Sequence, residues 1–155
     1  MTAPPLADLE EIAREVRLYI FRTAAETTRV PQVPEIAAAL HRPPGVVHEV
    51  LRHLAAGRVL MLAPNDGSIW AAAPFCAVPS GFRVESGGKR YWSICVWDAL
   101  GVAAILGRDA RIEALCGDCG DSLVLEVRHG ALHRSEGVIH FAIPARYWWD
   151  NIGFT

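Results

Sequence analysis

Residues 91–100 read Tyr-Trp-Ser-Ile-Cys-Val-Trp-Asp-Ala-Leu, and across them the hydrophobic pattern changes from that of a strand to that of a helix. Residues 89–92 have a strand pattern, whereas residues 95–106 are apolar on most sides and are followed by Gly107. A long apolar segment that ends at a glycine predicts a helix. We therefore expect a largely buried helix that begins at Cys95 and follows a strand.

The segments around this helix predict a small β-sheet packed on it. Five of them have strand-like composition: residues 83–86, 89–92, 110–115, 122–128 and 138–143. Gly87-Gly88 separates the first two, which is typical of a hairpin. Residues 116–121 form a predicted turn between the third and the fourth. A short terminal helix, rich in aromatic residues, is predicted at 145–152.

The first 75 residues predict three helices followed by a hairpin, which is the order of a winged helix. The helical segments are residues 6–26, a short stretch opened by Pro34, and a third opened by Pro43-Pro44 and ended by Gly57. Asn65-Asp66-Gly67 then separates two apolar runs, a strong hairpin signal. The expected fold class is α+β, with a winged-helix-like domain at 1–75 and an αβ core at 76–155.

Composition indicates a folded chain with no special affinity for polyanions. Apolar residues make up 52% and charged residues 21% of 155 residues, and the net charge is −2. No signal-peptide pattern or membrane-spanning run is visible, so we expect a cytoplasmic protein without a membrane partner. In that compartment Cys76, Cys95, Cys116 and Cys119 are expected to be thiols.

The winged-helix pattern raises the question of DNA binding. Residues 1–60 contain seven arginines and seven carboxylates, so their net charge is zero. Affinity for DNA depends largely on clustered basic residues that neutralise phosphates. The charge balance therefore argues against nucleic acid as a partner, and a DNA-binding regulator is one of the alternatives for this chain.

Cys95 and Asp98 are the residues with the clearest chemical potential. Three positions apart at the start of a helix, they share one face. The helix start favours a thiolate and predicts a Cys95 pKa below that of a free cysteine. Burial among apolar neighbours raises a carboxyl pKa, so that Asp98 can deliver a proton to whatever the sulfur holds. A buried cysteine beside a helix-capping aspartate is the structural alternative.

Residues 91–100, followed by Ala-Ile-Leu-Gly-Arg at 104–108, Ala-Arg-Ile at 110–112 and Cys116, resemble the core signature of the alkylmercury lyase (organomercurial lyase) family. In that family a Cys-x-x-Asp opens a buried helix, and a Gly-Arg-x-Ala-Arg strand leads to a second cysteine. The spacing from Cys95 to Cys116 matches without a gap. Val-Ile-His-Phe at 138–141 and the helical N-terminal half are similar too, so the resemblance extends over nearly the whole chain.

The resemblance implies protonolysis of a carbon–mercury bond, which gives a hydrocarbon and Hg(II). Cys95 would be a thiolate ligand of the metal, and Asp98 the proton donor that also contacts it. Cys116 matches a cysteine regarded as structural. No cofactor is implied; the partners are an organomercurial substrate and low-molecular-weight thiols that remove the bound Hg(II). Sulfur is a suitable ligand because thiolates are soft, as mercury is.

The chain departs from the family where a second catalytic cysteine normally precedes the late strand. Here that place reads Ser135-Glu136-Gly137. Cys76, in the proline-rich connector, and Cys119 are candidate substitutes, with Cys76 preferred. The alternatives are a metal- or thiol-binding homologue without lyase turnover, or an enzyme that uses Cys95 and Asp98 on another small molecule.

Two further motifs have open interpretations. Cys116-Gly117-Asp118-Cys119 has a spacing suited to metal binding, but a zinc site normally needs two more ligands, and turn thiols are the simpler explanation. His129, His133 and His140 are expected to be solvated or hydrogen-bonded. Tyr147-Trp148-Trp149 predicts packing in a core or lid, or a shield over an apolar substrate.

Overall fold

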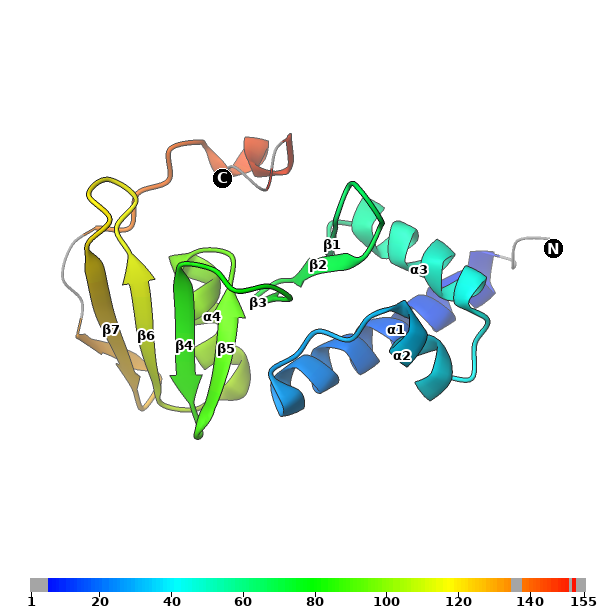
Figure 1. Ribbon diagram of the computed structural model, residues 1–155, viewed down its shortest axis with the longest axis horizontal. Helices are drawn as coiled ribbons and strands as arrows, with labels where there is room; N and C mark the ends of the chain where they lie inside the picture. Colours follow the sequence, from blue (N-terminus) through cyan, green and yellow to red (C-terminus); the bar gives the residue numbers. More distant parts are fainter. Residues whose placement is uncertain (1–5, 135–137, 151, 153–155) are drawn as a thin grey trace.

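The computed structural model describes residues 6–134, 138–150 and 152, which form an α+β protein with a helical half and a sheet half (Figure 1). The helical half contains α1 (Leu6–Thr27), α2 (Val33–Ala39) and α3 (Pro44–Ala56). A three-stranded antiparallel sheet follows, built from β1 (Met61–Leu62), β2 (Ile69–Ala72) and β3 (Phe75–Cys76). The expected α+β class is confirmed; the winged-helix likeness and the division at residue 75 stay predictions.

The three helices pack through apolar residues at helical spacing. On α1 the side chains of Ile12, Val16, Ile20 and Ala24 are buried, four residues apart, and on α3 Val47, Val50, Leu51 and Leu54 are buried. The opposite faces carry charged residues, so burying one face drives the helices together. Among the described residues, no helix combines the length and the hydrophobicity that crossing a membrane requires.

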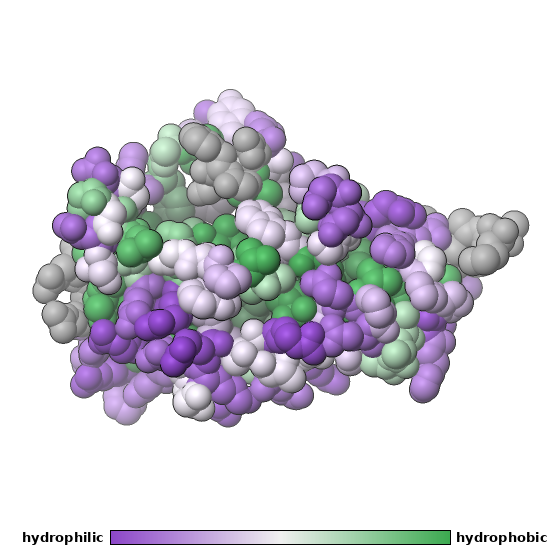
Figure 2. Space-filling view, in the orientation of Figure 1, coloured by the Kyte–Doolittle hydropathy of each residue, from purple (hydrophilic) through white to green (hydrophobic). Residues whose placement is uncertain are grey.

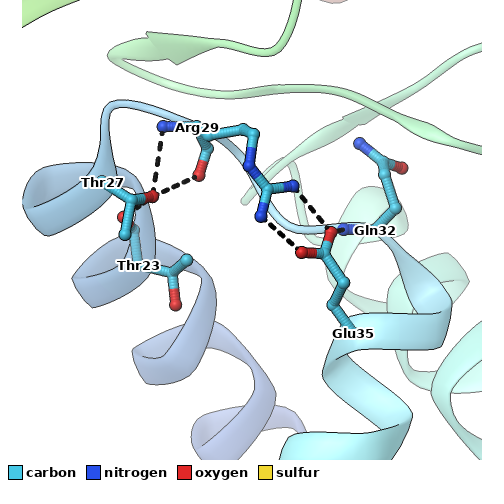
Figure 3. A network of polar contacts seen from close by, with 5 residues as sticks. All are labelled: Thr23, Thr27, Arg29, Gln32 and Glu35. Atoms are coloured by element: carbon cyan, nitrogen blue, oxygen red, sulfur yellow. Dashed lines mark hydrogen bonds and ion pairs between the residues drawn. The ribbon is translucent and has the colours of Figure 1, made fainter.

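Polar contacts fix the start of α2 between α1 and β2. The Glu35 carboxylate accepts hydrogen bonds from the Gln32 backbone N–H and from the Arg29 guanidinium (Figure 3). The Gln32 side chain is bonded in both directions to the backbone of Ile69, at 3.1 Å as donor and 2.9 Å as acceptor. These bonds satisfy polar groups at a helix start that would otherwise lack partners.

The sheet half is a five-stranded antiparallel sheet with α4 (Val96–Leu106) packed on one face. Its strand order is β5-β4-β6-β7-β8, and the strands are β4 (Phe82–Ser86), β5 (Lys89–Ser93), β6 (Ala110–Leu115), β7 (Ser122–Arg128) and β8 (Ala131–Arg134). Val84, Tyr91 and Ile112 are buried in one core with α4. The alternate residues carry charges on the outer face, where Arg83 pairs with Glu113.

Strand β3 joins the two halves. The Phe75 ring lies 6.5 Å from the Phe21 ring of α1 and 5.8 Å from the Tyr91 ring of β5, between ring centres. The Tyr91 hydroxyl donates a 2.8 Å hydrogen bond to the Ala25 carbonyl at the end of α1. Pro74 packs against Gly101 of α4, where a Cβ would lie 3.2 Å from the proline. In Figure 2 hydrophobic residues run across the middle of the molecule, where the halves meet.

Three sequence-based expectations are wrong in detail. Cys76 is not in a free connector, because β3 pairs with β2 and buries it. Residues 138–143 do not form a strand. Among the described residues the last strand is β8, which the two-residue turn His129-Gly130, with φ of 51° and 77°, folds back onto β7. Helix α4 is buried on one face only, since Trp97 and Ile105 are 57% and 56% exposed.

The other elements agree with the sequence-based expectations. Gly107, with φ of 59°, ends α4 in the left-handed conformation that glycine favours. The hairpins β1–β2 and β4–β5 form as predicted, and β6 and β7 have the predicted bounds. The terminal helix is a 3-10 helix, η1 (Ala145–Asp150), whose side chains are not buried.

The close approach of Pro74 to Gly101 gives a stability prediction. Gly101→Ala should lower the free energy of unfolding by about 1–2 kcal/mol, because the added methyl group overpacks a tight contact. Gly45→Ala in the first turn of α3 is the matched control: its Cβ would meet nothing within 4 Å, so stability should be unchanged or slightly higher. Urea unfolding of both variants measures the difference. Equal effects would contradict the packing argument.

Candidate active site

Cys95 lies at the junction where β5 ends and α4 begins. It is the N-cap residue of α4, with an extended backbone at φ −143° and ψ 177°. Its carbonyl accepts the first bond of the helix from Ala99, at 3.0 Å. The backbone N–H groups of Asp98 and Trp97 face the Cys95 sulfur and favour its thiolate. The helix start therefore gives the sulfur a fixed position with hydrogen-bond donors beside it.

Asp98 lies against this sulfur as the spacing predicts. The Cys95 thiol donates to Oδ2 of the Asp98 carboxylate over 3.4 Å, a normal separation for a sulfur donor. Burial raises the pKa of Asp98 above its ordinary value, and the bond from Cys95 opposes that rise only partly. The site thus holds a carboxyl group that takes up a proton more readily than an exposed aspartate.

The predicted depression of the Cys95 pKa is wrong. Burial is the largest influence and raises the pKa of the Cys95 thiol above its ordinary value. The N–H groups of the first helical turn act in the opposite direction, but they do not outweigh desolvation together with the nearby Asp98 charge. Cys95 therefore keeps its thiol proton to a higher pH than a free cysteine does, and this thiol is hydrogen-bonded to the Asp98 carboxyl group.

Cys76 lies close to the same pair. Gly101, which contacts Pro74, is one turn beyond Asp98 on the same face of α4, and Cys76 follows two residues after Pro74. The Cys76 side chain is 4% exposed, and its thiol faces the Trp70 carbonyl at 3.8 Å. Burial raises the pKa of Cys76, and the Asp98 charge raises it further. Cys76 is thus a protonated thiol within the electrostatic reach of Asp98.

Cys116 and Cys119 lie apart from this group, in the β6–β7 turn. Cys119 is exposed and Cys116 is half-buried. The backbone N–H groups of Cys119 and Asp118, with the Cys119 thiol, lower the pKa of Cys116. The Asp121 N–H favours the Cys119 thiolate, but the Asp121 carboxyl and the neighbouring Cys116 sulfur raise the pKa of Cys119. Within the described residues the pair is not part of any larger cluster of potential metal ligands.

Aromatic rings extend from the start of α4 to the C-terminal segment. The Trp97 ring lies 6.3 Å from the Phe141 ring, which lies 4.9 Å from the Trp148 ring, between centres. The Trp148 indole N–H donates to the Ile143 carbonyl at 2.8 Å, and Arg58 lies over Trp149 at 5.8 Å. Residues 138–150 therefore span from Trp97, beside Asp98, to the end of the helical half (Figure 1).

The sequence did not predict the buried Ser93 hydroxyl or the groove between α1 and α3. Ser93, two residues before Cys95, is fully buried, and its hydroxyl has no hydrogen-bond partner among the described residues. A groove of about 860 Å³ lies elsewhere, between α1 and α3, and contains none of the cysteines. Residues 135–137, where the family's second catalytic cysteine is replaced by Ser-Glu-Gly, lie outside the described residues. His129, His133 and His140 are exposed, as expected.

The fold and the site define an α+β protein with a thiol and a carboxyl group in contact at the start of a core helix, and comparison with known proteins identifies the family. The family model described as MerB, alkylmercury lyase, matches residues 75–155, just over half of the chain. The chain belongs to the alkylmercury lyase family. No curated protein sequence matches the chain.

A solved structure supports the same fold. The crystal structure titled as the mercury-bound form of MerB2 superposes with a TM-score of 0.60 at 18% sequence identity. The alignment covers 83% of this chain and 66% of that one, so this chain spans a little under two thirds of the length of that relative. The likeness extends over both halves of the molecule, whereas the family match begins at β3.

The order of cysteine reactivity follows from these pKa shifts and exposures. With iodoacetamide near neutral pH, Cys116 should be alkylated faster than Cys95 and Cys76. Only thiolates react, and the pKa is lowered for Cys116 but raised for Cys95 and Cys76. Peptide mass spectrometry at several labelling times gives the rate for each cysteine. Faster labelling of Cys95 than of Cys116 would restore the activated-thiolate interpretation.

Proposed function

We propose that this protein cleaves carbon–mercury bonds by protonolysis, releasing a hydrocarbon and Hg(II). The observation that carries the proposal is the contact between the Cys95 thiol and the Asp98 carboxylate at the start of α4, in a chain of the alkylmercury lyase family. A soft sulfur ligand next to a carboxyl group with a raised pKa supplies both requirements of the reaction, a metal anchor and a proton.

The hydrogen bond between Cys95 and Asp98 provides the path of the proton. When the sulfur binds R–Hg–X, an Hg–S bond forms, X⁻ leaves, and the thiol proton passes to the Asp98 carboxylate. The raised pKa of Asp98 favours that transfer. The carboxylic acid then protonates the carbon, which takes the electron pair of the breaking Hg–C bond, and R–H leaves. No atom is oxidised or reduced in these steps.

Cys76 is the proposed second thiolate. Its burial and its position within the reach of the Asp98 charge favour it over Cys119, which is exposed in the β6–β7 turn. A second sulfur on mercury adds electron density and weakens the Hg–C bond, and its proton returns to solvent or buffer. After protonolysis Hg(II) stays on the two sulfurs until low-molecular-weight thiols remove it, which suits a cytoplasmic reaction.

The aromatic group made of Trp97, Phe141 and Trp148 is proposed to shield the reacting bond and to contact the organic group of the substrate. Trp97 is adjacent to Asp98 in the sequence and touches Phe141. An apolar cover excludes water, and this preserves the raised pKa of the carboxyl group on which proton delivery depends. It also offers ring faces to an aryl or alkyl substituent.

The lyase proposal predicts how strongly each of five substitutions lowers the rate of benzene release. With phenylmercury and excess thiol, the protein should release benzene, whereas Cys95→Ser and Asp98→Asn should each lower the rate by about 10²-fold or more, because one removes the anchor and the other the proton. Cys76→Ser should lose most of the rate. Cys119→Ser is the matched thiol control and should keep it, and Cys116→Ser should mainly reduce stability. Headspace analysis of benzene measures each rate.

Two results would change this account. If Cys119→Ser loses activity and Cys76→Ser does not, the second sulfur has been assigned to the wrong cysteine. If the unmutated protein binds Hg(II) but releases no benzene, the lyase proposal fails and the alternative of a metal-binding homologue replaces it. Circular dichroism of every variant separates loss of function from loss of fold.

A further inference from the structure

The β6–β7 turn has a geometry that the proposed reaction does not use. The Cys116 N–H donates to the Asp121 carbonyl at 2.8 Å, and the Gly120 N–H donates to the Cys116 carbonyl at 2.9 Å. Gly120 has a φ of +75°, a conformation that glycine adopts without strain and that closes the turn. This compact turn holds two sulfurs three residues apart on one exposed loop.

The surroundings of the two sulfurs favour a cation. Backbone N–H groups of Cys119 and Asp118 lower the pKa of Cys116, and the side chains of Cys116 and Cys119 each shift the pKa of the other. The carboxyl groups of Asp118 and Asp121 lie close enough to act on this pair electrostatically. Two adjacent sulfurs bordered by acidic groups attract a metal ion, and they repel anions.

The number of ligands restricts which metal ion fits. Structural zinc is almost always bound by four protein ligands. In the part of the chain that the structure describes, there is no group of three or more histidine, cysteine, aspartate or glutamate side chains that could share an ion. Soft d¹⁰ ions such as Hg(II) form stable linear complexes with only two thiolates, and soft ligands select soft metals.

We propose that Cys116 and Cys119 form a second, solvent-facing dithiolate site that binds one soft, two-coordinate metal ion of the Hg(II) class. Binding forms two metal–sulfur bonds and releases two thiol protons, with no change of oxidation state. The site is separate from Cys95, Asp98 and Cys76, and binding there does not require lyase activity.

The strand register gives this second site a place in the proposed reaction. Phe82 of β4 is paired with Ser93 of β5 on one side and with Ala114 of β6 on the other. Ser93 and Ala114 are therefore two strand spacings, or about 10 Å, apart. Cys95 and Cys116 each follow two residues after these partners, so both lie at the same end of the sheet. If the lyase proposal holds, Hg(II) leaving Cys95 meets a second dithiol at this end.

Hg(II) titration of a Cys76→Ser/Cys95→Ser variant tests the second site without any lyase turnover. We expect one equivalent of Hg(II) per chain, seen as thiolate-to-metal absorption in the ultraviolet and as a one-metal mass in native mass spectrometry. The second sulfur has an effective concentration on the order of millimolar, so a monothiol at roughly one tenth of that should not remove the ion. Adding Cys119→Ser, an exposed position, should abolish this retention while the fold is unchanged.

Three results would overturn the proposal. They are retention of Hg(II) after Cys119→Ser, one metal shared by two chains, and Zn(II) held against a chelator as firmly as Hg(II) is held against the monothiol. If the unmutated protein releases no benzene, only the lyase proposal fails. The Hg(II) titration still tests the second site, because the titrated variant lacks Cys95. The two proposals therefore fail independently.

Discussion

The packing of Phe75 between Phe21 and Tyr91 is the constraint on which the arrangement of the molecule depends. These rings belong to β3, α1 and β5, so a single buried side chain ties the helical half to the sheet half. Aromatic side chains bury large areas, and such contacts contribute strongly to stability. Because Cys76 follows Phe75 in a two-residue strand, the same packing fixes where the Cys76 sulfur lies relative to α4.

The chemistry of the candidate site depends on a competition between burial and the helix start. N–H groups at the beginning of α4 favour a Cys95 thiolate, but burial has the larger effect and keeps the thiol protonated. The same burial raises the pKa of Asp98, so its carboxyl group accepts a proton at a higher pH than an exposed aspartate does. For protonolysis this is useful, because the proton that mercury displaces from sulfur stays next to the carbon that needs it.

Local sequence patterns were sufficient to predict most of the helices and strands, but not which of them pair or pack with one another. The apolar spacing of α1, the prolines before α2 and α3, and Gly107 after α4 are signals within a few residues, and the helices form where these signals indicate. The pairing of β3 with β2 depends on contacts with α1, β5 and Gly101, which no local pattern contains. The β8 strand had a local signal in His129-Gly130, whereas the sequence-based strand at 138–143 rested on composition and resemblance alone.

The set of atoms that coordinate bound Hg(II) tests the central claim most directly. That claim is that Cys76 and Cys95 bind the same mercury ion. X-ray absorption at the mercury edge, on a Cys116→Ser/Cys119→Ser variant loaded with one equivalent of Hg(II), leaves only these two cysteine sulfurs as ligands. The account predicts two sulfur neighbours at one distance, and loss of one of them in the further variant Cys76→Ser. A spectrum with one sulfur and one oxygen or nitrogen before that substitution would contradict it.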